Sequence, residues 1–147
     1  MKVVDANVLL YAVNEDSPKH EESREWLDAA LSGGATVGFS WIVLLAFIRL
    51  STKAGIFPRP LTLTGALGVV EAWLAQPAAV VVEPTVRHAS VLADLLQAVG
   101  VGGNLVNDAH LAALAVEHHG QVVTFDLDFD RFTGVKWENP GTHGSAV

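Results

Sequence analysis

The sequence predicts an α/β fold of three layers, in which a mainly parallel sheet of four to five strands lies between helices. Two observations favour this fold. Short runs of apolar, β-branched residues alternate along the chain with longer amphipathic segments, a pattern typical of parallel sheets whose strands are connected by helices. The run at 79–82 shows no alternation of polar and apolar side chains, as expected for a strand that is covered on both faces.

Two strands and four helices are predicted in the first half of the chain. They are, in order, a strand at 2–4, helices at 7–13 and 18–31, a strand at 35–39, a helix at 41–52, and a helix that ends at 76 and is capped by Thr62 or Thr64. Gly33 and Gly34 end the second helix. Ser40 is a favourable N-cap for the third, because its hydroxyl can accept a hydrogen bond from the first turn. Pro77 closes the fourth, since proline cannot continue a helix.

The second half of the chain is predicted to add two helices and to complete the sheet. The expected elements are a strand at 79–82, helices at 85–99 and 105–119, a strand at 121–125 and an edge strand at 135–137. Gly100 and Gly120 end the two helices, because glycine readily adopts the conformation that follows a helix. The sequence has no repeats or linkers, so we expect one domain over 1–140 and a flexible tail over 141–147.

Composition excludes several classes of protein. Half of the 147 residues are hydrophobic and only 17% are charged, which supplies enough apolar material for a core and excludes intrinsic disorder. The chain has no cysteine, so disulfide scaffolds, thiol catalysis and zinc sites with sulfur ligands are excluded. Its longest apolar stretch, 38–48, is shorter than the ~18–20 residues of a membrane span. We therefore expect a soluble, cytoplasmic protein without a membrane partner.

The balance of charge limits how the protein could bind nucleic acid. Nine Lys and Arg residues stand against sixteen Asp and Glu residues, which gives a formal net charge of −7. Binding through released counterions alone requires a dense field of basic side chains, and this chain lacks one. A polyanionic partner would therefore need positive charge from another source.

Two predicted strands are followed directly by an aspartate. Asp5 comes after the strand 2–4, and Asp126 comes after the strand 121–125. Because ligands of open parallel sheets bind beyond the carboxyl ends of the strands, both side chains are expected at the same edge. The alternative is that each aspartate is a turn former or a helix cap, which is the commoner role after a strand.

A third aspartate lies on a predicted helix that is apolar almost all round. Asp108 shares a stripe of small residues within the helix 105–119, and the solvent side is expected to carry His110, Leu114 and Glu117. A buried acid is costly unless it is paired or bound to a metal. The alternative is that Asp108 only stabilises the positive N-terminus of its helix.

Three carboxylates that converge on one pocket repel one another. Two unit charges 4 Å apart interact by roughly 4 kcal/mol at an effective dielectric constant of 20. Protons or a hard cation must relieve this repulsion. A site made only of oxygen ligands suits Mg²⁺, with Mn²⁺ as the alternative, and such an ion would supply the positive charge that the chain lacks.

These aspartates stand in segments that resemble a known family. The segments are VVDAN (3–7), GNLVNDAHLAALA (103–115) and VTFDLDFDRF (123–132), with LLAFIRL (44–50), PRPL (58–61) and WENP (137–140). They resemble PIN-domain ribonucleases, and specifically the VapC-type toxins of bacterial type II toxin–antitoxin pairs. The likeness extends over nearly the whole chain, to about Pro140.

The resemblance implies a PIN-like α/β/α sandwich and an endoribonuclease that depends on Mg²⁺ or Mn²⁺. Its substrates would be cellular RNAs such as tRNA, rRNA or mRNA. Asp5 and Asp108 are implied to be the principal metal ligands, and Asp126 completes the catalytic acidic cluster. The side chains expected to orient these ligands or a water molecule are Ser40, Asn104 and Thr124. The implied partners are a second copy of the chain, as a homodimer, and a small VapB-like antitoxin.

One position departs from the family pattern. Most PIN domains carry a further acid on the helix after the second strand, where this chain has Ala46. The change favours one tightly held ion over two. Asp128 and Asp130 could substitute for the lost acid, but we expect both to be solvated turn or cap residues.

Two other functions remain open from the sequence. The replacement at Ala46 suggests a catalytically weak PIN module that binds RNA or a partner without cutting. The pair Asp126 and Asp128 also matches the nucleophile and general acid of a haloacid-dehalogenase-like phosphatase, although its place near the C-terminus argues against this. Candidates for guiding an RNA backbone, or else for solubilising the surface, are Arg49, Lys53, Arg59 and Arg131.

Overall fold

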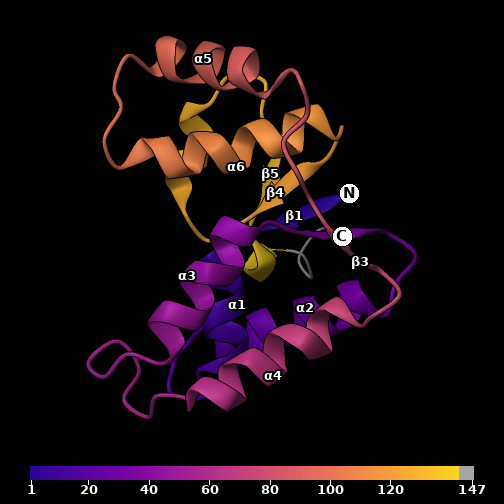
Figure 1. Cartoon of the computed structure of the whole chain (residues 1–147), viewed down its shortest axis with the longest axis vertical. Helices are drawn as coiled ribbons and strands as arrows, with labels where there is room; N and C mark the ends of the chain where they lie inside the picture. The colour runs from indigo at the N-terminus through magenta and orange to yellow at the C-terminus, as the bar shows by residue number, and fades with distance from the viewer. Residues whose placement is uncertain (143–147) are drawn as a thin grey trace.

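The computed structural model describes residues 1–142 and confirms the predicted α/β fold. Within this part of the chain, five strands form one sheet in which every pair of neighbours is parallel (Figure 1). The strands are β1 (Lys2–Val4), β2 (Val37–Phe39), β3 (Ala79–Val81), β4 (Gln121–Val123) and β5 (Trp137–Glu138). Each strand is short, so most of the ordered backbone lies in the helices that cover the sheet.

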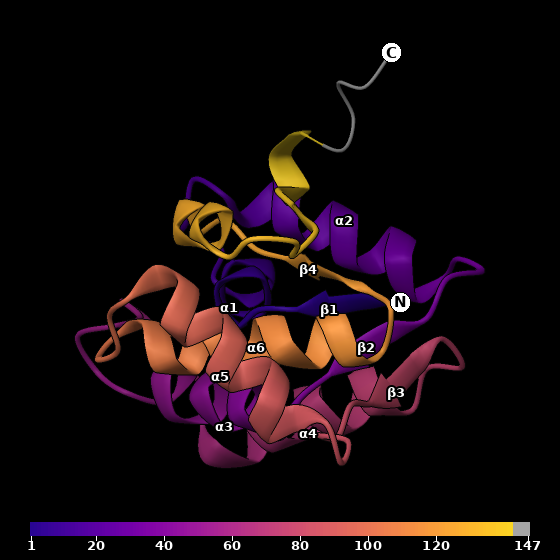
Figure 2. The ribbon, with the colours of Figure 1, turned by 90° about the horizontal axis from the view of Figure 1, so that it is seen from above.

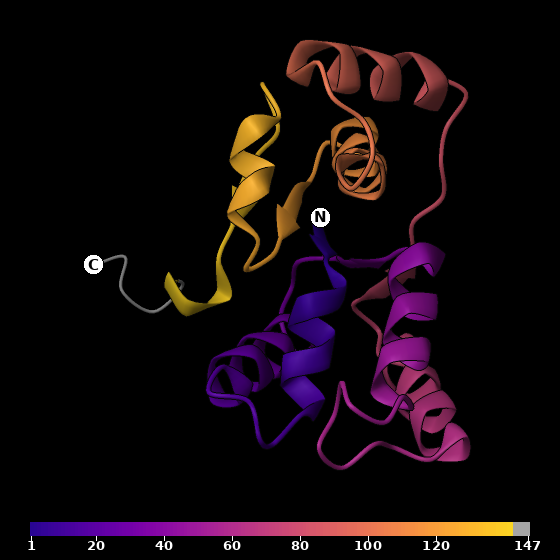
Figure 3. The same ribbon diagram turned by 90° about the vertical axis from the view of Figure 1, so that its left-hand side faces the viewer.

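Helices cover both faces of the sheet. They are α1 (Ala6–Val13), α2 (His20–Leu31), α3 (Trp41–Ser51), α4 (Leu63–Leu74), α5 (His88–Val99) and α6 (Leu105–Glu117), with the short 3₁₀ helices η1 (Leu127–Arg131) and η2 (Pro140–Thr142). The first four form one outer layer, and α5 and α6 form the other (Figures 1 and 3). Parallel crossovers are right-handed, so helices change face when the chain reverses its direction across the sheet.

That reversal lies between β1 and β4. The strand order is β3-β2-β1-β4-β5, so the chain moves outward from β1 to β3 and then returns to the other side of β1. In open parallel sheets a crevice forms beyond the carboxyl ends of the strands where the order reverses, and ligands bind there. The two strands at this point are the ones that precede Asp5 and Asp126.

The strands at the reversal are the centre of the core. The side chains of Val3, Val4, Val122 and Val123 are fully buried, and β1 lies between α6 and α2 (Figure 2). Fully burying a valine contributes roughly 1.5–3 kcal/mol relative to its exposed state, so these four positions hold the sheet centre firmly. The rigid centre fixes the position of whatever follows the two strands.

Apart from the strand at 2–4, the predicted strands differ from those observed in their bounds and, at β3, in burial; the edge strand predicted at 135–137 shares only Trp137 with β5. Val80 and Val81 are 36% and 40% exposed, so the prediction that the run at 79–82 is covered on both faces is wrong. The apolar run indicated a strand but could not place it, and β3 is an edge strand of the sheet. The predicted strand 121–125 ends at Val123, because Thr124 and the residues after it turn into the site.

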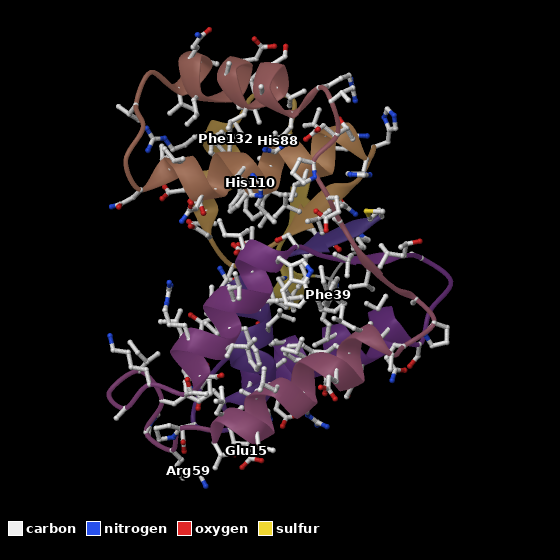
Figure 4. All side chains as sticks on the ribbon, viewed as in Figure 1. Glu15, Phe39, Arg59, His88, His110 and Phe132 are labelled. Carbon is white, nitrogen blue, oxygen red and sulfur yellow. The ribbon has the colours of Figure 1, made fainter. Side chains whose placement is uncertain are left out.

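The predicted solvent side of α6 is also wrong. Leu114 is fully buried and Glu117 is 5% exposed, because α5 packs on this side of α6. The Glu117 carboxylate accepts hydrogen bonds from the backbone N–H and hydroxyl of Thr85 (2.9 and 2.6 Å) and pairs with Nδ1 of His88 (2.5 Å). His88 in turn contacts His110 through ring nitrogens 2.9 Å apart, and both rings lie in the layer formed by α5 and α6 (Figure 4).

The predicted tail is described only in part. Gly141 belongs to η2, and residues 143–147 lie outside the described part of the chain. Among the residues that the structure describes, no helix is both long enough and apolar enough to cross a membrane.

Replacing Glu117 with glutamine should destabilise the contact between α5 and α6. Burial alone would raise the pKa of Glu117, but hydrogen bonds from Thr85 and His88 outweigh it and lower the pKa. The amide puts a donor where donors already point, so Glu117→Gln should cost about 2 kcal/mol in urea unfolding at pH 7. Above its ordinary pKa of 4.5, the wild-type Glu117 carboxylate stabilises the folded protein, and this contribution is lost as the pH falls through the lower pKa of the folded state. The difference in unfolding free energy between the wild type and Glu117→Gln should therefore shrink in acid.

The matched control is Glu71→Gln, which removes an exposed carboxylate on α4. It should change the free energy of unfolding by less than about 0.5 kcal/mol. Equal stability of the Glu117→Gln and Glu71→Gln proteins would show that the buried carboxylate does not hold α5.

Candidate metal-dependent active site

The first acid of the candidate site follows β1 directly. Asp5 is the N-cap of α1, and its Oδ1 accepts a hydrogen bond from the N–H of Ala6 (2.7 Å). Its Oδ2 accepts one from the hydroxyl of Thr124 (2.7 Å). Burial raises the pKa of Asp5, the two hydrogen bonds oppose this rise, and the charge of Asp126 adds to it. Asp5 is therefore a helix cap, as the alternative interpretation held, and also part of a group of interacting acids.

Thr124 and Asn7 join the ends of β1 and β4. The Thr124 hydroxyl donates to Asp5 and accepts from the Asn7 side-chain amide (3.1 Å) and the N–H of Asp126 (3.0 Å). The hydroxyl thus uses its one donor and both acceptor sites. The amide oxygen of Asn7 accepts from the N–H of Phe125 (3.2 Å). This network fixes the orientation of the Asp5 carboxylate relative to the segment after β4.

Asp126 and Asp128 belong to the tight turn that opens η1. The Oδ1 of Asp126 accepts a hydrogen bond from the N–H of Asp128 (2.9 Å), which caps the 3₁₀ helix. One carboxylate oxygen from each of Asp108, Asp126 and Asp128 lies within 4.8 Å of the others, the one such trio of acids in the described part of the chain. Asp128 is exposed, as predicted for a turn residue, but its carboxylate also joins the cluster.

Asp108 connects the two halves of the acidic cluster. It lies in the first turn of α6, in the layer opposite α1, whose N-cap is Asp5 (Figure 1). Burial raises its pKa, and the charges of Asp5, Asp126 and Asp128 raise it further, to about 6. Asp5 stands outside the tight trio, yet its charge acts on Asp108 more strongly than that of Asp126 or Asp128. The structure therefore brings together the three predicted acids and adds Asp128.

A small cavity borders the site on its α3 side. It has a volume of about 90 Å³ and is lined by residues of α1, α3 and α6 that include Asp5, Ala46 and Asp108. The methyl group of Ala46 faces this space, where a longer acidic side chain would approach both carboxylates. The position of the missing acid therefore borders a gap beside Asp5 and Asp108.

The three residues predicted to orient ligands behave differently from one another. Thr124 binds Asp5 directly, as described above. Ser40 is only 1% exposed, and its hydroxyl has no hydrogen-bond partner within the described chain. Asn104 is exposed at the N-terminus of α6 and makes no side-chain cap. Of the three, Thr124 alone holds one of the acids in this structure.

Sequence reasoning missed the part played by Asn7. Its spacing from Asp5 was a usable signal, because an Asn two residues after a cap residue lies on the first turn of the helix, close to the cap. What the spacing could not reveal is the second contact, to the backbone of Phe125, which is 118 residues away in the chain.

One of the four candidate cations is unsuited to guiding RNA. Arg59 forms a forked pair with Asp16 (3.2 and 3.1 Å) and lies 3.8 Å from Glu15. Arg59 and Glu15 lie at the end of the molecule distant from the layer of His88 and His110 (Figure 4). Two acids already offset the charge of Arg59, so it adds little positive potential for an RNA backbone.

The donor set fits a hard divalent cation. All side-chain donors of the cluster are carboxylate oxygens, which suits Mg²⁺ or Mn²⁺ better than softer metals. Burial first, and then the charges of the neighbouring acids, raise the pKa of Asp108 to about 6, so the ionised carboxylate is costly to keep without a counter-charge. A divalent ion among Asp5, Asp108, Asp126 and Asp128 would remove that cost.

Comparison with known proteins identifies the family. Residues 2–135 match the model of the PIN domain. The chain is 62% identical over 140 residues to ribonuclease VapC37 of Mycobacterium tuberculosis, and the alignment covers 95% of this chain and 97% of the relative. Ribonuclease VapC31 of the same species is 39% identical over 140 residues, covering 95% and 99%. The chain therefore belongs to the PIN-domain family, and within it to the group of VapC ribonucleases.

Solved structures have the same fold. VapBC2 from Rickettsia felis, solved bound to a DNA fragment from its promoter, matches with a TM-score of 0.68 and 19% identity over 94% of this chain and 97% of the other. VapC20 from Mycobacterium tuberculosis, a toxin that cleaves the sarcin–ricin loop, matches with a TM-score of 0.67 and 18% identity over 92% and 99%. At these identities the likeness concerns the fold.

Replacing Asp108 with asparagine should stabilise the protein in EDTA at pH 7. The pKa of Asp108 is about 6 in the folded protein against an ordinary 3.8, so the ionised carboxylate lowers the free energy of unfolding at pH 7. Solvent screening reduces this cost to ~1 kcal/mol. Because the folded pKa is raised, the wild type should gain stability as the pH falls from about 6 towards 3.8. The Asp108→Asn protein should lack this gain, as thermal unfolding from pH 4 to 8 would reveal.

Asp94→Asn, which changes an exposed aspartate on α5, is the matched control and should unfold as the wild type does. A drop in the unfolding temperature of Asp108→Asn at pH 7 in EDTA would mean that the acids are not held against their mutual repulsion.

Proposed function

We propose that the protein is a metal-dependent endoribonuclease that hydrolyses phosphodiester bonds of cellular RNA, as the toxin of a VapBC-type pair. The observation that carries this proposal is the meeting of four carboxylates from three distant segments at the reversal point of the sheet. Burial, and after it the charges of the other acids, raise the pKa of Asp108 to about 6. Structural acids are normally paired with bases, whereas these acids face one another. The names of the VapC relatives support the same activity.

Each residue of the cluster has a distinct part in the proposal. Asp5, Asp108 and Asp126 hold the divalent ion, which we propose to be Mg²⁺, with Mn²⁺ as the alternative. Asp128 adds a carboxylate to the same cluster. Thr124 and Asn7 keep the Asp5 carboxylate turned toward the other acids, because both donate hydrogen bonds to its Oδ2 (2.7 and 3.4 Å). These positions make up the proposed catalytic site.

The proposed chemistry is hydrolysis of one backbone linkage. A bound divalent ion lowers the pKa of water and offsets the charge that develops on the phosphate. The carboxylates of the cluster would hold the ion and would accept a hydrogen bond from the attacking water. A carboxylate oxygen of the cluster that does not hold the ion would accept a proton from that water. The proton then leaves with the departing oxygen of the RNA chain.

The alternative function is an RNA- or partner-binding PIN module without activity. Ala46 favours it, because an acid is missing and a cavity of about 90 Å³ stands beside Asp5 and Asp108. Asp128 weighs against it, because its carboxylate brings the cluster back to four acids. The PIN-domain match over residues 2–135 leaves no support for a haloacid-dehalogenase-like phosphatase.

We further propose a small VapB-like antitoxin and a second copy of the chain as partners. Exposed large apolar side chains lie on α3 and α4, at Trp41, Leu45, Leu63 and Leu67. Such side chains are enriched at protein interfaces and are unfavourable in water. The solved structure of a toxin–antitoxin complex from Klebsiella pneumoniae shares the fold at 16% identity, with a TM-score of 0.63. We propose that the toxin acts in the cytoplasm, where its RNA substrates are.

The direct test is cleavage of total RNA from a bacterium, with and without Mg²⁺, by the purified chain. We expect discrete products in Mg²⁺, none in EDTA, and recovery when Mg²⁺ is restored. Asp5→Asn should lower the rate by at least 100-fold, because it removes a charge that binds the ion while keeping the shape of the helix cap. The Asp94→Asn protein should cleave at the wild-type rate.

Binding can be measured apart from cleavage. Mg²⁺ should raise the unfolding temperature of the wild type and leave that of Asp108→Asn almost unchanged, since a ligand stabilises only the state that binds it. A wild-type chain that binds Mg²⁺ in this way but cuts no RNA would favour the inactive binding module. A chain that neither binds Mg²⁺ nor cuts RNA would refute the proposed nuclease.

A further inference from the structure

An aromatic side chain stands between two residues of the proposed active site. Phe125 follows Thr124 and precedes Asp126, and its backbone N–H is held by the Asn7 side chain (3.2 Å). Asn7 also contacts Asp5 and Thr124, so the Phe125 backbone has a fixed position relative to the acids. Phe125 is half-buried, which leaves part of the side chain at the surface.

The surroundings of the Phe125 ring come from two separate elements. Tyr11 of α1 packs against it edge to face, with the ring centroids 5.4 Å apart. The ammonium group of Lys19, an exposed residue just before α2, lies over the ring, 4.7 Å from its centroid. Tyr11 therefore supports the ring, while a flexible cation covers one of its faces. We call these three residues, Tyr11, Lys19 and Phe125, the aromatic corner.

An unpaired nucleobase would bind this face better than the lysine does. A cation over an exposed aromatic ring gains about 2- to 5-fold in an equilibrium, whereas a base stacked on an aromatic side chain gains about 5- to 150-fold in affinity. A base would therefore displace the ammonium group. The freed Lys19 carries a positive charge that can pair with the adjacent phosphate, in a protein with a net charge of −7.

We propose that the aromatic corner is the nucleobase subsite for single-stranded RNA, with Phe125 as the stacking platform and Lys19 as a phosphate contact. This inference rests on the proposed ribonuclease function and adds the position of a base next to the cut linkage. Every base can stack on an aromatic ring, so the subsite selects an unpaired nucleotide but does not discriminate between the four bases. RNA that is base-paired at this position cannot stack on Phe125 and is disfavoured.

The test uses binding in a protein that should not cleave. The probe is a 5′-fluorescein hexamer of uridine, titrated in EDTA against the Asp108→Asn protein while anisotropy is followed. Adding Phe125→Leu should weaken binding at least 5-fold, since leucine keeps an apolar contact with Tyr11 but has no ring face. Adding Phe125→Tyr should keep binding within 2-fold. Lys19→Gln should weaken it about 3-fold and reduce its dependence on salt.

The control for charge is Lys136→Gln, which removes the same charge at an exposed residue just before β5. Lys136 stands at the amino ends of the strands, opposite the acidic cluster, and its change should leave binding within 1.5-fold. A second probe with 2-aminopurine at its centre reports stacking directly. Its fluorescence should be quenched by the protein with Phe125 and much less by Phe125→Leu.

The outcomes separate this inference from the proposed function. One outcome is that the wild type cleaves RNA, while adding Phe125→Leu or Lys19→Gln to the Asp108→Asn protein changes neither probe binding nor quenching. In that case the nucleobase subsite is wrong and the proposed nuclease function stands. If the wild type cuts nothing, yet quenching still depends on the Phe125 ring, the subsite belongs to an RNA-binding module. Equal loss in Lys19→Gln and Lys136→Gln, or no binding of either probe, also overturns the subsite.

Discussion

The structure depends on carboxylates held closer together than their charges favour. Burial and, to a smaller extent, repulsion from the other acids raise the pKa of Asp108 to about 6, and the fold must supply the energy that keeps the acids in place. The buried valines of β1 and β4 provide it, because the two strands cannot separate without exposing the centre of the core. A protein in this state is poised to bind a cation, since the ion replaces repulsion with attraction.

The order of the strands explains why the acids meet at all. The chain reverses direction between β1 and β4, so residues that follow these strands enter one crevice although about 120 positions separate Asp5 from Asp126. The helices change face at the same reversal, and α6 therefore brings Asp108 from the opposite layer. Thr124 and Asn7 fix the relative positions of the acids, because their hydrogen bonds join the segment after β1 to the segment after β4.

The loss of an acid at Ala46 changes the balance of the site. Most of the charge now lies on the side of η1, where Asp126 and Asp128 share one turn, while a small cavity borders the α3 side. In the proposed site, this asymmetry favours one ion held near Asp108. The segment from Thr124 to Asp128 carries several of the functional groups of the site, because it holds a hydroxyl, an aromatic ring and two acids within five residues.

Local features of the chain were enough to place the strands and helices approximately and to single out the three acids as candidates, because apolar periodicity, caps and strand-end aspartates are encoded over a few residues. The sequence alone could not place β3 at an exposed edge or bury Glu117 beneath α5, since both depend on which element packs where. Nor could it show that Asp128 joins the acids, or that Asn7 and Lys19 reach Phe125. Those contacts join segments far apart in the chain, and only the packing of the layers sets the distances between them.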